Sequence, residues 1–503
     1  MQTAELKKRA LGAAAWALVR TGGDQLIRFT LFVYLARVLT PADFGVFAVA
    51  TIIVDYGRLL SSAGLNEAII QAETADDELL NTIFWSLMGL TVVVASVLAI
   101  GSPLLASFSG VPAAQPFMAA LAGCLLLGPL ASVHATMAVR NFKNKKLTAR
   151  SLIASAVGAA AALVSAYAGL GLWSLIVQQV VGGVLSVVVT WIAFPWRPRL
   201  QFSIPRLRTV WRFSGNLLLA RALQMSVLRV QSLLAARFLG PAMLGQFRIA
   251  GRSFELLNMA FISPVSSAAL PTLARLQSDP KAFNNAYARM ISLCCLAACP
   301  VAFGFAAVSQ DAVPLIFGAR WMPAVPAIQM LALLSPATVL AAFAGPALAA
   351  QGRTDVTVKF AWMQLIGTTI FSLIAVRFGI VALAGAYVLR SYLTLPVQLR
   401  LFGETTGMPI RRILGCVAPS LAAAAAMACA VVGLRFLLTD WLPLARMAGM
   451  IAAGGVVYAG VLFVFFRRFV QAQFAGLDLS RFLPRVSPRA DLQKPAPDTG
   501  DAA

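Results

Sequence analysis

ARVLTPADFGVF at residues 36–47 returns as ARFLGPAMLGQF at residues 236–247, with seven of twelve positions identical at an offset of 200 residues. In each copy a residue that suits a helix N-cap, Thr40 or Gly240, precedes a proline that suits the first helical turn. Asp43 completes a capping-box-like Thr-x-x-Asp pattern in the first copy only. Each copy therefore predicts the end of one helix, a tight turn and the start of the next.

The composition around the repeat is that of a membrane protein. Of the 503 residues, 59% are hydrophobic and 12% are charged, and the mean hydropathy is +0.81. A soluble domain carries about 25% charged residues, so an ordinary soluble enzyme is excluded. Apolar runs of roughly 20 residues, the length needed to cross a bilayer, follow one another along the chain. We therefore expect an all-α integral membrane protein.

The apolar runs predict about fourteen transmembrane helices. Six form an N-terminal lobe at residues 1–195, namely 11–36, 43–66, 81–101, 117–138, 150–168 and 173–194. After a basic cytoplasmic linker at 196–212, six more form a C-terminal lobe at residues 213–401, namely 213–236, 244–268, 286–308, 323–349, 358–376 and 381–400. A last helix pair, 412–434 and 445–466, lies within 412–467, and a cytoplasmic tail at 468–503 is expected to be partly disordered.

Six helices separate the two copies of the repeat, so both halves enter the membrane in the same direction. This predicts two six-helix lobes related by a pseudo-two-fold axis along the membrane normal, a plan that transporters share. With the N-terminus inside, 25 basic residues lie in cytoplasmic segments and 5 in outer loops, which predicts that both termini are cytoplasmic.

The net charge of +22 is compatible with three kinds of partner: nucleic acid, an anionic membrane surface or an anionic ligand. The basic residues occupy short gaps between apolar runs instead of one solvated face, which argues against nucleic acid. Six cysteines and the single histidine, His134, show neither metal-ligand spacing nor a disulfide framework. No metal and no cofactor are expected.

Charges inside the predicted helices point to a functional site. Eleven basic residues remain there, and seven of them belong to the first and second helices of the two lobes: Arg20, Arg28, Arg58, Arg221, Arg229, Arg248 and Arg252. The same helices hold Asp24, Asp55 and Glu255. Each charge would cost about 2.5–3.5 kcal/mol at mid-depth in lipid, so we expect all of them to face a hydrated cavity between the lobes.

Seven arginines against three acids give this cavity a charge of about +4. Guanidinium groups offer planar, bidentate donors to phosphate, so the excess favours a polyanionic substrate. The three acids could orient the arginines, pair with them in the empty cavity, or carry protons or cations. Structural ion pairing and snorkelling at helix ends are the alternative interpretation. Arg390, inside the predicted helix 381–400, is assigned no role from the sequence.

The stretches LARVLTPADFGVFAVATII (35–53), AVRNFKNKKLTAR (138–150), LPTLARLQSDPKAF (270–283) and LIFGARWMPA (315–324) resemble Wzx-type flippases of the multidrug/oligosaccharidyl-lipid/polysaccharide (MOP) exporter superfamily. The resemblance covers nearly the whole chain. It implies that undecaprenyl-pyrophosphate-linked oligosaccharide repeat units move from the cytoplasmic to the periplasmic leaflet of the bacterial inner membrane, by alternating access, for exopolysaccharide, capsule or O-antigen synthesis. Membrane lipids and a polysaccharide polymerase with its export machinery would be partners. Gln231 departs from the family pattern, in which an acid is common, so a sodium site is in doubt.

Two rival functions remain. A cation-coupled multidrug exporter of the same superfamily would recognise cations with acids alone, and the arginine excess argues against it. A membrane polysaccharide polymerase or glycosyltransferase would need catalytic acids or a large domain outside. The short outer loops hold little beyond Asp311 and Asp440 as acids, so the chain is not expected to be an enzyme.

Overall fold

The computed structural model describes residues 2–62, 64–72, 76–351, 354–438 and 440–474. Among these residues the secondary structure is helical, with no strand, which confirms the predicted all-α membrane fold. By length and hydropathy they provide ten helices that could cross a membrane, or twelve if each of two bent pairs forms one span. The first helix, which carries Arg20, Asp24 and Arg28, is not among them.

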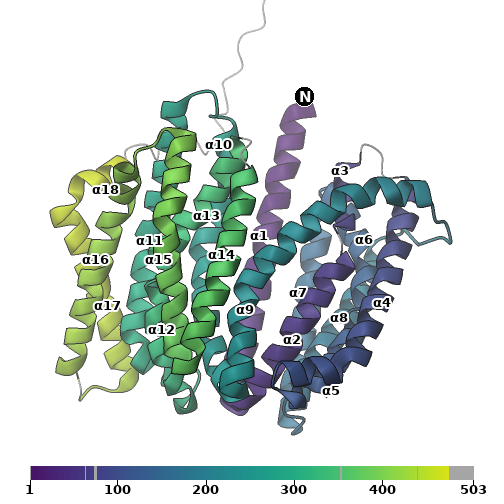
Figure 1. Ribbon diagram of the computed structural model, residues 1–503, viewed down its shortest axis with the longest axis horizontal. Helices are drawn as coiled ribbons and strands as arrows, with labels where there is room; N and C mark the ends of the chain where they lie inside the picture. The colour runs from purple at the N-terminus through teal and green to yellow at the C-terminus, as the bar shows by residue number, and fades with distance from the viewer. Residues whose placement is uncertain (1, 63, 73–75, 352–353, 439, 475–503) are drawn as a thin grey trace, which may run out of the picture.

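Two bundles stand side by side in Figure 1, with the first at the right and the second at the left. The first contains α1 (Gln2–Val38), α2 (Pro41–Ser62), α3 (Leu65–Gln71), α4 (Asp77–Phe108), α5 (Gln115–Cys124), α6 (Leu127–Arg140), α7 (Asn144–Tyr167) and α8 (Trp173–Ala193). The second contains α9 (Ile204–Leu257), α10 (Ser263–Ala274), α11 (Pro280–Ile316), α12 (Val325–Ala332), α13 (Ser335–Ala350), α14 (Thr354–Ala375) and α15 (Ile380–Thr406). Beyond it lie α16 (Ile410–Leu437), α17 (Pro443–Phe465) and the short α18 (Arg467–Phe474).

The segments expected to connect and follow the lobes are partly helical. The predicted linker at 196–212 runs into α9, which starts at Ile204, and its backbone is held on the first lobe by the side chain of Asn81. Of the predicted tail, residues 468–474 lie in α18, and the prediction of disorder for 475–503 lies outside the described residues.

The repeated turns differ in one respect that the sequence explains. In the first copy the backbone N–H and the hydroxyl of Thr40 donate to the Asp43 carboxylate at 2.9 and 2.7 Å, and the Asp43 N–H donates back to the Thr40 hydroxyl at 3.2 Å. The predicted capping box is therefore formed. The second copy lacks these side chains, and its chain turns at Gly240, whose φ of 82° is open to glycine at little cost. There α9 kinks between the predicted helices 213–236 and 244–268.

One predicted span in each lobe is broken. The predicted helix 117–138 consists of α5 and α6, bent by 41°, and the predicted helix 323–349 consists of a short 3-10 turn, η3 (Ala319–Ala324), followed by α12 and then α13, bent by 53°. The sequence at both breaks is similar, LLGP at 126–129 and LLSP at 333–336. Proline removes a backbone donor and clashes with the preceding turn, so each helix restarts there.

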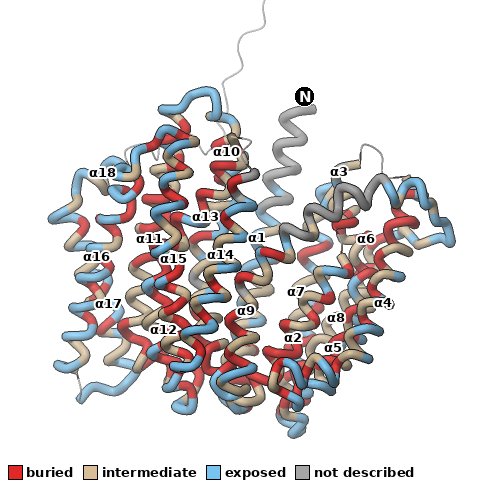
Figure 2. Tube along the Cα trace, viewed as in Figure 1, coloured by how far each residue is buried: buried red, intermediate tan, exposed pale blue. Residues whose placement is uncertain are grey.

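A continuous core joins the two lobes at the end where α1 meets α2. Leu39, Phe44, Leu244 and Trp321 are buried together in it. Figure 2 shows buried residues along the facing sides of the helices and exposed residues along their outer sides. Those outer sides carry large apolar groups such as Ile100, which suit contact with lipid.

Candidate functional site

Hydrogen bonds between the lobes close the end at which they share a core. The indole Nε1–H of Trp321 donates to the carbonyl of Ala36 at 2.7 Å, and the Arg320 guanidinium donates to that of Leu39 at 3.2 Å. In the other direction, Arg37 donates through Nε to the carbonyl of Ile316 at 3.0 Å. The ends of α1 and α11 are thus capped by each other's lobe, because helix C-termini leave carbonyls without intrahelical partners.

Away from this end, Asp55 on α2 joins the lobes. Its carboxylate accepts from Arg229 on α9 at 3.1 Å and from Arg58 on its own helix at 3.4 Å. Ser226 lies on α9 about one turn before Arg229, and its hydroxyl accepts a hydrogen bond from the Tyr56 hydroxyl at 3.1 Å. Three of the predicted site residues therefore meet at one carboxylate, which partly neutralises both guanidinium groups.

Carboxylates also hold two further predicted arginines of α9. Arg252 pairs with Glu255 at 3.2 Å and reaches across to the amide oxygen of Gln25 on α1 at 3.1 Å. The predicted site residue Arg248, four residues before Arg252 on the same helix, is half-buried. Arg221 pairs at 2.8 Å with Glu67, which the sequence analysis did not single out. Glu67 lies on α3, a short helix that follows directly on the predicted helix 43–66, so hydropathy alone did not separate it.

The predicted residues of α1 face α7 instead of α9. Arg28 donates through Nε to Asp24 at 2.7 Å, and Asp24 also accepts a hydrogen bond from the Ser155 hydroxyl on α7. Arg20 lies close enough to Arg150 of α7 for their charges to interact. The ten predicted residues thus form two groups, one between the lobes and one inside the N-terminal lobe.

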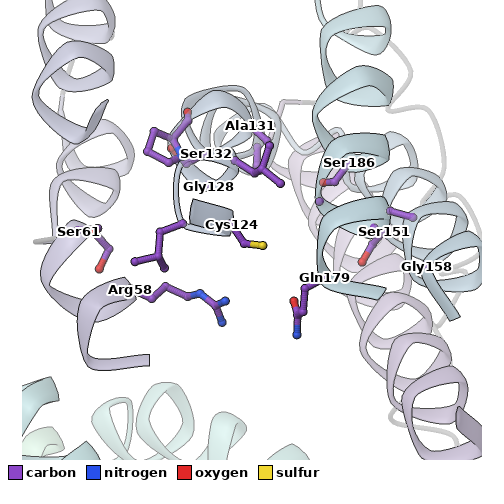
Figure 3. A pocket seen from close by; sticks show the side chains of 18 of the residues that line it. Arg58, Ser61, Cys124, Gly128, Ala131, Ser132, Ser151, Gly158, Gln179 and Ser186 are labelled. Atoms are coloured by element: carbon purple, nitrogen blue, oxygen red, sulfur yellow. The ribbon is translucent and has the colours of Figure 1, made fainter. Parts of the chain in front are cut away.

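The N-terminal lobe contains an open cavity of about 470 Å³. Arg28 and Arg58 line it together with Arg150, so three guanidinium groups from three helices share one space. Its walls also carry three amides and several hydroxyls: Asn66, Gln178, Gln179, Ser61, Ser62, Thr91, Ser132, Ser151, Ser155 and Ser186. No aspartate or glutamate is among the described residues that line it. In Figure 3 the side chains of Arg58 and Gln179 extend into this space from opposite sides.

Close helix packing and a helix break shape the walls of the cavity. A Cβ on Gly158 of α7 would stand 3.2 Å from the Cα of Gly182 on α8, so these two helices touch backbone to backbone. On another wall the break between α5 and α6 places Cys124, Leu125 and Gly128 at the cavity surface. Small residues and the bend thereby leave room in the lobe that larger side chains would fill.

Arg150 differs from the other two cavity arginines in its partners. Arg28 and Arg58 each pair with a carboxylate, whereas Arg150 donates to the neutral Thr190 hydroxyl at 3.1 Å. The buried Nε of Arg150 has no hydrogen-bond partner among the described residues. The sequence analysis placed Arg150 at the first residue of the predicted helix 150–168 and did not select it as a site residue. It lies six residues past the start of α7 at Asn144, about 9 Å into the helix at 1.5 Å per residue.

A similar sequence spacing in the C-terminal lobe leads to a buried arginine. The helices α8 and α15 begin after Gly171 and Gly379, and eleven residues after each glycine stand Gly182 and Arg390. Arg390 is only 4% exposed, and it donates to the Ser391 hydroxyl at 2.8 Å. Gly182 lines the cavity of the N-terminal lobe, whereas the side chain of Arg390 is packed inside the C-terminal lobe.

The fold and the site can be compared with known proteins. Residues 34–326 match the model of a family described as polysaccharide biosynthesis protein. The chain is 25% identical over 358 residues to the succinoglycan biosynthesis transport protein ExoT of Rhizobium meliloti (strain 1021), covering 70% of this chain and 72% of that protein. It is 23% identical over 364 residues to the lipopolysaccharide biosynthesis protein WzxC of Escherichia coli (strain K12), covering 71% and 73%.

Solved structures resemble it over a larger share of the chain. The lipid II flippase MurJ in an inward closed conformation aligns with a TM-score of 0.72 at 14% identity, covering 91% of this chain and 100% of that one. An inward-facing multidrug resistance MATE family transporter of the MOP superfamily aligns with a TM-score of 0.60 at 14% identity, covering 78% and 98%. At these identities the likeness shows a shared fold.

Proposed function

The chain belongs to the polysaccharide biosynthesis protein family, and from that premise we propose that it is a flippase for a lipid-linked polysaccharide precursor. Its fold is that of MOP superfamily transporters, as its resemblance to Wzx-type flippases implies. The substrate we propose is an undecaprenyl-pyrophosphate-linked oligosaccharide repeat unit. It would pass from the cytoplasmic to the periplasmic leaflet of a bacterial inner membrane.

The acid-free cavity of the N-terminal lobe is the observation that supports this proposal. Three guanidinium groups and many neutral hydrogen-bonding groups line it, a combination that suits an anionic, hydroxyl-rich ligand. A lipid-linked oligosaccharide is such a ligand, with a diphosphate at one end and hydroxyls along its length. The cavity offers a cationic drug no carboxylate, so it does not favour multidrug export.

The ion pairs between the lobes suggest how substrate binding and lobe movement are coupled. Asp55 neutralises Arg58 and Arg229 and links α2 to α9. A diphosphate would compete with this carboxylate for the guanidinium groups, because phosphate oxygens accept the same bidentate bonds. Binding would then weaken one link between the lobes, and the lobes could rock.

The closed end of the molecule fixes the direction of opening in this proposal. If both termini are cytoplasmic, as the distribution of basic residues predicts, the turn at residues 38–41 lies on the periplasmic side. The hydrogen bonds of Ala36, Leu39 and Trp321 then close the periplasmic end, and this structure represents a state that receives substrate from the cytoplasmic leaflet.

The proposal is tested by reconstituting the purified chain in liposomes that contain undecaprenyl-pyrophosphate-linked oligosaccharide. A membrane-impermeant glycosidase reports the fraction of substrate in the outer leaflet. We expect the chain to move substrate between leaflets, and Arg28→Ala and Arg58→Ala each to slow this at least tenfold. The matched control is Arg377→Ala, which removes an exposed arginine from the short 3-10 turn that follows α14. Wild-type liposomes that show no redistribution, or arginine variants as active as the control, would contradict the assignment.

A further inference from the structure

We propose that the cavity of the N-terminal lobe is the saccharide subsite of the transporter and that it takes an acidic sugar. Arg150 binds the carboxylate of that sugar, and Gln178 with Gln179 bind its hydroxyls. This inference rests on the proposed function and extends it by naming the chemical class of the repeat unit.

The lipid tail determines which arginines meet the diphosphate. The tail stays in the bilayer, so the diphosphate attached to it enters between the lobes, where α2 faces α9. Arg58 on α2 and Arg28 on the cavity side of α1 are 61% and 47% exposed there. The saccharide, carried beyond the diphosphate, then reaches the wall built by α7 and α8. Arg150 and the two glutamines belong to that wall.

Arg150 is the cavity arginine whose charge requires a ligand. Asp24 and Asp55 compensate Arg28 and Arg58, while Arg150 has the neutral Thr190 hydroxyl and a buried Nε without a partner. The nearby Arg20 adds a second positive charge. Burying a guanidinium without a counter-charge is costly, and a carboxylate would satisfy it through two parallel hydrogen bonds. A neutral saccharide would leave this charge uncompensated.

The rest of the wall suits sugar hydroxyls. The side-chain amides of Gln178 and Gln179 both donate and accept hydrogen bonds, as do the serine hydroxyls beside them. Sugar hydroxyls need this dual capacity, because each is a donor and an acceptor. The volume of about 470 Å³ is within the range of about 300–1,000 Å³ that ligand pockets span.

Equilibrium binding to the purified full chain in lipid nanodiscs tests the proposal with three probes. Sodium glucuronate and glucose differ in the carboxylate, and inorganic pyrophosphate represents the diphosphate. Saturation-transfer NMR measures the two sugars, and calorimetry measures pyrophosphate. We expect glucuronate to bind at least tenfold more tightly than glucose, and Arg150→Gln to remove that difference while pyrophosphate binds as before. Arg58→Gln should show the reverse pattern. Lys146→Gln removes an exposed charge from the same helix outside the cavity and should change none of the three affinities.

Three results would overturn the assignment. One is wild-type protein that binds glucuronate no more tightly than glucose. Another is an Arg150→Gln variant that loses as much affinity for pyrophosphate as for glucuronate, which would make Arg150 a phosphate ligand. If Arg150→Gln does not fold, Gln179→Leu replaces it, and unchanged binding of both sugars by that variant would also overturn the proposal. The binding assay does not depend on transport, so the two proposals can fail separately. A chain that binds glucuronate but does not move substrate between leaflets contradicts only the proposed function. A chain that moves substrate without binding glucuronate contradicts only this inference.

Discussion

Gly45 lies directly against the backbone carbonyl of Pro241, and Gly245 lies in the same way against that of Pro41. A Cβ on Gly45 would stand 2.8 Å from the Cα of Pro241, and a Cβ on Gly245 would stand 3.1 Å from the Cα of Pro41. Gly45 and Gly245 occupy the same position in the two copies of the repeat, and each contacts the proline of the other copy. Such a reciprocal contact is what a pseudo-two-fold axis between the repeats would produce.

Replacing either glycine with alanine should therefore force the lobes apart. The new methyl groups would meet backbone and not a flexible side chain, so neither neighbour can move aside cheaply. We expect Gly45→Ala and Gly245→Ala each to lower the free energy of unfolding by about 1–3 kcal/mol, as overpacking does in cores. Thermal unfolding of the purified variants measures this. Gly89→Ala on α4 is the control, because nothing lies within 4 Å of its Cβ position, and equal stability of all three variants would contradict the prediction.

The repeated turn could be predicted from the sequence because the residues that determine it are close together in the chain. Thr40, Pro41 and Asp43 specify a helix start within four residues, and the structure forms the predicted capping box. The breaks at LLGP and LLSP were not predicted, because an apolar run shows the length of a span but not whether its hydrogen bonds continue through it. Membrane helices can contain proline, so the prolines at these positions did not by themselves predict a break in the helix.

The site was only partly readable for a related reason. Intramembrane charge identified Arg28 and Arg58, which both line the cavity. Hydropathy placed Arg150 at the end of a predicted helix, where a charge calls for no functional explanation. It also gave no reason to select Gln178 or Gln179, whose importance comes from the wall on which they lie. Sequence periodicity gives the position of a residue along its helix, whereas a cavity depends on which sides of several helices face one another.

Trp321 should act as a latch at the closed end of the molecule. Its side chain is fully buried, and its Nε1–H donates to the carbonyl of Ala36 in the other lobe. Trp321→Phe keeps an aromatic ring but leaves that carbonyl without its donor, at a cost of about 1–3 kcal/mol. We expect the population to shift toward a state open at this end.

Spin labels on two exposed residues can detect that shift. Phe108 at the end of α4 and Phe378 after α14 belong to different lobes, and each is replaced by cysteine in a chain whose native cysteines have been removed. Pulsed electron resonance should give a longer distance component in Trp321→Phe than in the parent. Trp173→Phe serves as control, because Trp173 packs on Phe117 within the first lobe. An unchanged distance distribution in Trp321→Phe would show that this hydrogen bond does not hold the lobes.

Asp311 should anchor the last helix pair to the C-terminal lobe. The sequence analysis placed this acid in an outer loop, but it lies on α11 with its side chain 3% exposed. It pairs with Arg435 of α16 at 3.2 Å and with Arg446 of α17. Asp311→Asn would leave two guanidinium groups without a counter-charge, and breaking a buried pair costs about 3–5 kcal/mol. We expect a lower unfolding temperature and faster proteolysis between α15 and α16, whereas the exposed Asp440→Asn should behave as wild type.

Arg390 offers the opposite case, a buried charge whose removal should help. It is 4% exposed, its Nε is without a partner in the described part of the chain, and its nearest aromatic group is the Tyr387 ring at 5.0 Å. Methionine has a similar length and no charge, and apolar replacement of buried charges is often neutral or stabilising by about 1–4 kcal/mol. We expect Arg390→Met to raise the unfolding temperature and to preserve transport. A folded variant that has lost transport would instead give Arg390 a functional role.

The Asp55 carboxylate should compete with phosphate for the guanidinium groups of Arg58 and Arg229. The carboxylate is shared by Arg58 at 3.4 Å and Arg229 at 3.1 Å, and all three side chains keep contact with solvent. Asp55→Asn removes the charge that competes with phosphate, so pyrophosphate should bind more tightly, by roughly the 0.2–1 kcal/mol of a solvent-exposed ion pair. Transport should slow nevertheless, because the amide no longer draws the lobes back together after release. Calorimetry with pyrophosphate and the liposome assay measure the two effects separately, and Asp77→Asn at the exposed start of α4 is the control. If Asp55→Asn weakened pyrophosphate binding, the carboxylate would support the phosphate site instead of competing with it, and the proposed resetting role would be wrong.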